Sequence, residues 1–235
     1  MPSFSHQYHG CFMKKIFFSI CICLFSISNI SQASGISVGG TRFVYEENKR
    51  EIDIPIFNSD KEKPFLIQSW VSPFNGEGKA PFIATPPLFR IEPDTNGSAR
   101  ISYIGEPINS NEEKIYLLNI KSIPPKNNSI ENELQIIINS QFKLFLRSKD
   151  IEPFDFEKVN LVEKSDGVMI DNQTPYHLSI KNILINDKVI DGASLIYPFK
   201  NDYILKKKIN NGDSIVVQFI NDYGAIIEKK PSKSI

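Results

Sequence analysis

The chain has 235 residues, of which 41% are hydrophobic, so it is long enough for two domains of roughly 100 residues with ordinary cores. Lysine plus arginine and aspartate plus glutamate number 27 each, and this balance gives no support to a nucleic-acid partner or an acidic substrate. We expect any electrostatic function to depend on local charge.

Residues 1–33 are predicted to be a secretory leader and not part of the fold. Met13-Lys14-Lys15 is basic, Ile16–Ile30 is apolar apart from scattered Ser and Asn, and Ser31-Gln32-Ala33 places small residues at positions −3 and −1 of a signal-peptidase site. The apolar run is short and interrupted for a membrane span, although a retained amphipathic anchor is the alternative. We expect Met1–Phe12 to reflect a start codon assigned too far upstream, and the mature chain to begin near Ser34.

The three cysteines, Cys11, Cys21 and Cys23, all lie in the expected leader, so the mature chain is predicted to have no disulfide and no cysteine metal site. One histidine, His177, follows the leader, and nothing around it resembles a nucleophile elbow. No glycine-rich phosphate loop is present either. The sequence therefore predicts no enzyme, no cofactor and no nucleotide, and a β-sandwich hydrolase using His177 is the weaker alternative.

After the leader, short β-rich runs follow one another with turn signals about every ten residues. Ile52, Ile54 and Ile56 alternate with polar residues, and Pro55 within this run suggests an edge strand or a bulge. No window of helical length has a sustained period near 3.6. The remaining predicted strands of this block are Ile36–Tyr45, Phe65–Val71, Pro81–Ile83, Leu88–Ile91, Ala99–Ile104 and Ile115–Ile120. This pattern predicts a β-sandwich.

The last run of this block, Asn132–Arg147, is the most unusual. Leu134, Ile136 and Ile138 have a spacing of two, so they project from one face of an extended strand. Lys143 follows within a second apolar run, where a cation needs either water or an anion. Taken alone, the stretch also fits a half-buried strand with one solvated lysine.

Around Arg147–Phe156 the pattern becomes polar and contains a proline, as an interdomain linker does. A second β-rich set follows, with its clearest strands at Val168–Ile170, Tyr176–Ile185, Asp202–Lys206, Ser214–Ile220 and Ala225–Ile227, and Lys229–Ile235 is expected to be a polar tail. We therefore expect a domain at residues 34–149 and a second domain at residues 150–235.

Several segments, in order, resemble the periplasmic chaperones of chaperone–usher pilus assembly. They are Gly40–Tyr45, Thr85–Pro93, Ile108–Pro124, Leu134–Ile136 with Phe142–Phe145, Asn172–Tyr176 and Ile220–Gly224. Each motif is moderately specific, whereas the ordered set covers nearly the whole mature chain. Lys114, where a serine is usual, and Leu117, where an aromatic residue is usual, depart from the family signature.

The resemblance implies an all-β fold of two immunoglobulin-like sandwiches set at an angle, located in the periplasm. It implies that the protein binds, folds and caps pilus (fimbrial) subunits by donor-strand complementation and delivers them to the outer-membrane usher. The short segment Lys126–Glu133 resembles the loop of the short-loop branch of the family. The alternatives are a chaperone for a non-fimbrial surface polymer and a structural pilus subunit.

The resemblance also implies roles for particular residues. Leu134, Ile136 and Ile138 correspond to the donor strand, and Arg42 and Lys143 correspond to the anchor for the subunit's terminal carboxylate. Three further residues, Glu113, Arg147 and Asp222, correspond to a salt-bridge network between the domains. Because the donor strand is apolar, we also expect self-pairing into a capped homodimer.

Overall fold

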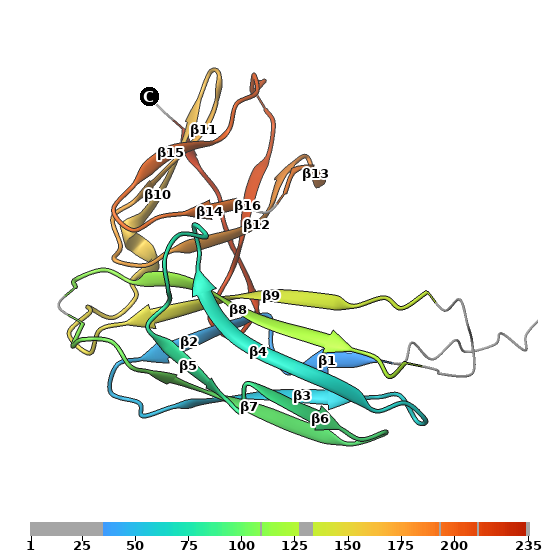
Figure 1. Cartoon of the computed structure of the whole chain (residues 1–235). Coiled ribbons are helices and arrows are strands. Elements are labelled where there is room, and N and C mark those ends of the chain that lie inside the picture. The colour runs from blue at the N-terminus through green and yellow to red at the C-terminus, as the bar shows by residue number, and fades with distance from the viewer. Residues whose placement is uncertain (1–34, 109, 127–133, 193, 211, 234–235) are drawn as a thin grey trace, which may run out of the picture. The chain divides into compact units, whose positions relative to one another are not determined.

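The computed structural model describes residues 35–108, 110–126, 134–192, 194–210 and 212–233. The expected leader and most of the expected short loop lie outside these residues. The described residues form eighteen β-strands and one short 3-10 helix (Figure 1), so the predicted all-β fold is confirmed. None of their helices is long and apolar enough to cross a membrane.

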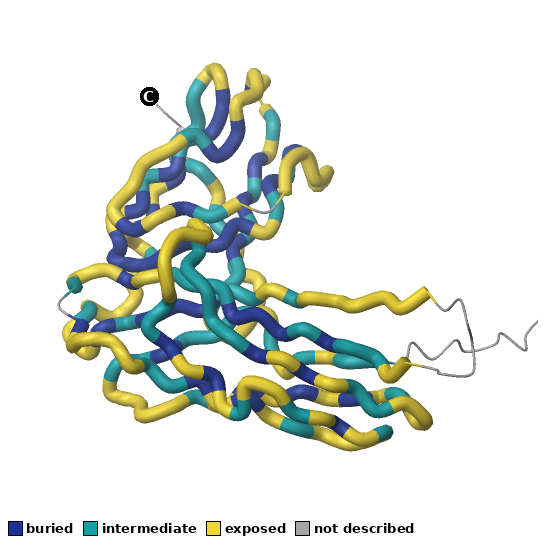
Figure 2. The backbone as a smooth tube through the Cα atoms, viewed as in Figure 1, coloured by how far each residue is buried: buried dark blue, intermediate teal, exposed yellow. Residues whose placement is uncertain are grey.

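The first half of the described chain forms two sheets. One contains, in spatial order, β1 (Ile36–Val38), β3 (Ile52–Asn58), β7 (Asn96–Tyr103) and β5 (Phe82–Thr85). The other contains β2 (Arg42–Glu46), β9 (Ile138–Arg147), β8 (Lys114–Ile123), β4 (Phe65–Pro73) and β6 (Leu88–Ile91). Ile54, Ile101, Leu118 and Leu144 belong to one buried cluster drawn from both sheets. The alternation of buried and exposed residues along these strands (Figure 2) is the pattern of a sandwich.

Pro55 lies in β3, which has a partner strand on each side and no register shift against either, so the prediction of an edge strand or a bulge is wrong. The proline is tolerated because β1 is short: its pairing with β3 ends at Val38 opposite Ile56. The missing amide hydrogen of Pro55 therefore falls beyond the ladder, whereas its carbonyl oxygen accepts a hydrogen bond from the backbone N–H of Gly39 at 2.8 Å.

The second half forms two further sheets around a separate buried cluster that includes Ile170, Ile180 and Val217. One sheet has the order β15 (Asn201–Leu205), β11 (Gly167–Asn172), β10 (Val159–Lys164) and β18 (Ser232–Lys233). The other has the order β13 (Lys188–Asp191), β12 (Leu178–Ile185), β16 (Ile215–Ile220) and β17 (Ile226–Lys229), and β14 (Ser194–Ile196) also pairs with β12. The 3-10 helix Phe156–Lys158 precedes β10.

The prediction that Lys229–Ile235 is a polar tail is partly wrong. Ser232 and Lys233 form β18, which pairs in parallel with Val162 and Glu163 of β10. In addition, the Ser232 hydroxyl donates to the carbonyl oxygen of Leu161 at 3.1 Å. The end of the described chain therefore contributes to a sheet.

Candidate functional site

A two-glycine turn brings the first candidate residue into place. The chain passes from β1 in one sheet to β2 in the other through Gly39-Gly40, and the Gly40 N–H donates to the Val38 carbonyl oxygen at 2.8 Å. A Cβ atom on Gly39 would lie 3.1 Å from the Pro55 ring, so the close approach favours glycine. As a result, β2 runs parallel to β9 with Arg42 directly opposite Lys143.

β9 has one edge that is only partly covered. It pairs with β8 along all but its last residue, from Ile138 opposite Ser122 to Leu146 opposite Lys114. On its other edge, β2 covers only the part that begins at Lys143. Within the described chain, the backbone of residues 138–142 is therefore paired on one side and free on the other, as a strand-addition site requires.

The apolar residues that lead into this free edge are exposed. Leu134, Ile136 and Ile138 have exposed fractions of 86%, 67% and 57%, and none belongs to a buried cluster. Ile137, on the other face of the predicted strand, is 47% exposed. These side chains do not fill their own core, whereas Leu144 and Leu146 later in the same stretch are buried.

The predicted strand begins later than expected. β9 starts at Ile138, and residues 134–137 have no strand partner in the described part of the chain, so Leu134 and Ile136 precede the strand. The facing strand β8 ends at Ile123, where Pro124 and Pro125 lack the N–H groups that would extend the ladder. The Gln135 side chain reaches across to this strand end and donates to the Pro124 carbonyl oxygen at 2.7 Å.

Arg42 is buried and only partly neutralised, with 7% of its side chain exposed. It donates to the Ile220 carbonyl oxygen at 2.6 Å, lies 3.5 Å from an Asp222 carboxylate oxygen, and its guanidinium sits 4.4 Å from the centre of the Phe145 ring. Its Nε has no hydrogen-bond partner among the described residues. Burial lowers the pKa of Arg42, and the nearby Asp222 charge only partly opposes this effect.

Lys143 is the less satisfied of the two cations, since its side chain makes no hydrogen bond or ion pair with the described residues. Burial, together with the charge of Arg42, lowers its pKa. The sequence, through the family resemblance, pairs Arg42 with Lys143 and does not place an acidic residue of the chain beside them. The structure brings the two residues together, but the Asp222 carboxylate beside Arg42 corrects that picture.

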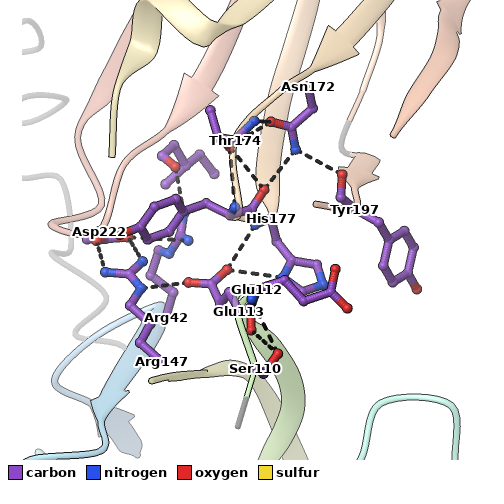
Figure 3. A network of polar contacts seen from close by, with 12 residues as sticks. Arg42, Ser110, Glu112, Glu113, Arg147, Asn172, Thr174, His177, Tyr197 and Asp222 are labelled. Atoms are coloured by element: carbon purple, nitrogen blue, oxygen red, sulfur yellow. Dashed lines mark hydrogen bonds and ion pairs between the residues drawn. The ribbon is translucent and has the colours of Figure 1, made fainter. Parts of the chain in front are cut away.

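The three remaining candidates form one connected group (Figure 3). Arg147 donates from Nε to Glu113 at 2.7 Å and from both terminal nitrogens to Asp222 at 2.6 and 2.9 Å. The Glu113 side chain is fully buried, and its second oxygen accepts the backbone N–H of His177 at 3.0 Å and lies 3.1 Å from His177 Nδ1. Every carboxylate oxygen in the group has a partner.

The electrostatic shifts agree with this pairing. Burial opposes the charge of Arg147, but the hydrogen bonds and charges of Asp222 and Glu113 outweigh it and raise its pKa above the ordinary range. Burial likewise raises the pKa of Asp222, but its hydrogen bond with Arg147 and the charges of Arg147 and Arg42 produce a net lowering. Both groups are therefore held in their charged forms.

Two local turns position this group. The Asn221 side-chain oxygen accepts hydrogen bonds from the backbone N–H groups of Tyr223 and Ala225 at 3.0 and 2.9 Å, and the resulting turn contains Asp222. The buried Asn172 side chain donates to the carbonyl oxygens of Tyr176 and Tyr197, and it fixes the loop before His177. The sequence suggested His177 only as a candidate catalytic base, and no sequence spacing indicates its contact with Glu113, 64 residues away. Among the described residues, no group of three or more His, Cys, Asp or Glu side chains could hold a metal ion.

Residues 35–152 match the family model described as "Pili and flagellar-assembly chaperone, PapD N-terminal domain", and residues 156–231 match "Pili assembly chaperone PapD, C-terminal domain". The chain belongs to the pilus-assembly chaperone family. The resemblance inferred from the ordered motifs is thus confirmed.

Individual members of the pilus-assembly chaperone family are similar over most of the chain. "Probable fimbrial chaperone LpfB" of Escherichia coli O157:H7 is 33% identical over 190 residues, covering 78% of this chain and 81% of that protein. The SafB chaperone of Salmonella enterica, solved in complex with the SafA pilin, has 25% identity and a TM-score of 0.72 over 85% of this chain and 98% of that one. The Pseudomonas aeruginosa CupB2 chaperone has 25% identity and a TM-score of 0.71 over 84% of this chain and 100% of that one.

Proposed function

We propose that this chaperone binds pilus subunits by adding the free edge of β9 to the subunit's incomplete sheet. The observation that carries the proposal is the free backbone of residues 138–142 next to exposed Leu134, Ile136 and Ile138. The backbone edge supplies hydrogen bonds, and side chains spaced by two supply apolar contact. Burying each of the three side chains in a subunit groove contributes about 1.5–3 kcal/mol before the cost of association.

The second part of the proposal assigns Arg42 and Lys143 as the anchor for the subunit's terminal carboxylate. Lys143 has no partner among the described residues, and the buried Nε of Arg42 is an unsatisfied donor that costs about 1–3 kcal/mol. A carboxylate bound here would also set the register of the added strand. A slip of one residue would turn the wrong face toward the groove.

A third part concerns the two sandwiches, which we assign to residues 34–149 and 150–235. We propose that Glu113, Arg147 and Asp222 hold them in one working arrangement, with His177 completing the shell of Glu113. None of these residues is assigned a catalytic role, because strand addition makes and breaks no covalent bond. We also propose that the chaperone acts in the periplasm and delivers subunits to an outer-membrane usher. In addition, we propose that the free chaperone caps itself as a homodimer and that it belongs to the short-loop branch of the family.

Co-purification from the periplasm tests the proposed function. Wild-type chaperone is expected to carry secreted subunits with it, whereas folded Arg42→Ala and Lys143→Ala variants are expected to lose them. Arg100→Ala, which removes an exposed arginine 3.7 Å from Glu51 on the other sheet, is the matched control and is expected to retain the subunits. Equal subunit recovery with all four proteins would refute the anchor.

A further inference from the structure

The five-stranded sheet β2-β9-β8-β4-β6 concentrates positive charge, although the whole chain is neutral. Its strands carry one acidic residue, Glu46, and six basic residues. The basic residues are Arg42, Arg90, Lys114, Lys121, Lys143 and Arg147. The sheet therefore has an uneven charge that favours an acidic partner.

Most of these cations are already paired or face elsewhere. Arg147 binds Glu113 and Asp222, Arg90 lies 2.8 Å from Glu92, and Arg42 lies near Asp222. By contrast, the side chains of Lys121 and Lys143 make no hydrogen bond or ion pair within the described part of the chain. The proposed anchor uses Lys143, which leaves Lys121 without an assigned role.

Lys121 and Lys143 lie on the same face of the sheet. Lys121 is opposite Asn139, and Lys143 is opposite Leu117. Directly opposed residues share a face of the sheet, and so do residues two or four apart on one strand, so the two lysines share a face. Leu118 and Leu144 belong to the buried core and lie on the opposite face, so both lysines point away from the core. Along β8, Lys121 is four residues from Leu117, a distance of about 13 Å in the direction of the free edge of β9.

The surface between the two lysines is polar and uncharged. Asn119 is 1% exposed, and its side-chain oxygen accepts from Gln141 at 2.8 Å and from Asn139 at 3.4 Å. Its side-chain nitrogen donates to the Ser72 hydroxyl at 3.0 Å. The side-chain amides of Asn119, Gln141 and Asn139 hydrogen-bond to one another against the sheet. Because they carry no charge, they do not neutralise Lys121.

We propose that Lys121 is a specificity-determining residue that pairs with an acidic side chain of the subunit. The inference rests on the proposed function. The two lysines are about 13 Å apart along the strand direction, which is about four residues of extended chain. If the subunit's terminal carboxylate binds Lys143, the subunit residue about four positions before the carboxyl terminus therefore lies level with Lys121. The added strand and β8 lie on opposite sides of β9, about 10 Å apart, so extended lysine and glutamate side chains reaching over Asn139 can meet.

Two short synthetic peptides test this inference. Both alternate apolar and polar residues and end in a free carboxylate, and they differ only in Glu or Gln at the fourth residue before the terminus. Calorimetric titration at low ionic strength is expected to show that wild-type chaperone binds the Glu peptide about two- to fivefold more tightly. This preference is expected to disappear in Lys121→Met, to reverse in Lys121→Glu, and to persist in Lys114→Met, a control on the same strand but the opposite face.

The outcomes separate the inference from the proposed function. If Lys121→Met retains the wild-type preference for Glu, the inference is wrong, and loss of binding in Lys143→Ala would show that the anchor still stands. If Lys143→Ala binds both peptides as tightly as wild type, the anchor itself is wrong. If wild-type chaperone binds neither peptide, both ideas are contradicted. Unfolding curves for each variant establish that the fold is retained.

Discussion

Removing Arg147 is expected to destabilise the protein strongly. Arg147→Met would leave the fully buried Glu113 carboxylate without its cation, and Asp222 would lose two hydrogen bonds. Breaking a buried ion pair by removing one partner costs about 3–5 kcal/mol, because the remaining charge stays desolvated. We expect the lower half of that range, since 38% of the Asp222 side chain is exposed and water can reach it.

Urea unfolding followed by Trp70 fluorescence measures this cost in the first sandwich. Arg90→Met is the matched control, because Arg90 and Glu92 form an exposed pair at 2.8 Å worth at most about 1 kcal/mol. The double variant Glu113→Gln/Arg147→Met is expected to be more stable than the sum of the single changes by about 0.5–3 kcal/mol. If Arg147→Met and Arg90→Met cost the same, the buried network does not contribute as we reason.

Three further predictions follow from the same contacts. Lys143→Met is expected to raise the thermal midpoint by up to about 4 °C, because burial and Arg42 disfavour the lysine charge; a lower midpoint in calorimetry would contradict this. The folded pKa of Asp222 is lowered, so its stabilisation is present above the unfolded value of about 3.9 and is lost as pH falls through the folded value. Acid titrations should show Asp222→Asn less stable than wild type at neutral pH and the gap closing below about pH 4, whereas a constant gap would refute this. Finally, Ile136→Asp should change unfolding by less than about 0.5 kcal/mol yet abolish subunit co-purification, and a large loss of stability would place the side chain in the core.

The sequence patterns predicted most strands because their apolar residues alternate around a buried face. Ile54 and Ile56, for example, are fully buried between exposed neighbours. Four strands were missed, β10, β13, β14 and β18, although Val159 and Leu161 of β10 are buried on either side of the exposed Asn160 in the same way. β13 is exposed along its whole length and has no apolar face to detect, and β18 contains only two described residues.

The site was harder to predict because its contacts join distant positions. Arg147 and Asp222 are 75 residues apart, so only the family resemblance brought them together before the structure did. The late start of β9 depends on Pro124 and Pro125 ending the facing strand, a tertiary effect that the alternation of Leu134 and Ile136 does not encode. Likewise, no local pattern indicates that Asp222 lies beside Arg42.

The most direct test of the account is backbone amide hydrogen exchange along β9, measured for free chaperone and for chaperone bound to a co-purified subunit. We expect those amides of residues 138–142 that face away from β8 to exchange readily in the free protein, because the described structure gives that edge no partner, and to become protected in the complex. Amides of Leu144 and Leu146, already inside the sandwich, should change little. Unchanged exchange at residues 138–142 in a complex that demonstrably contains the subunit would contradict strand addition at this edge.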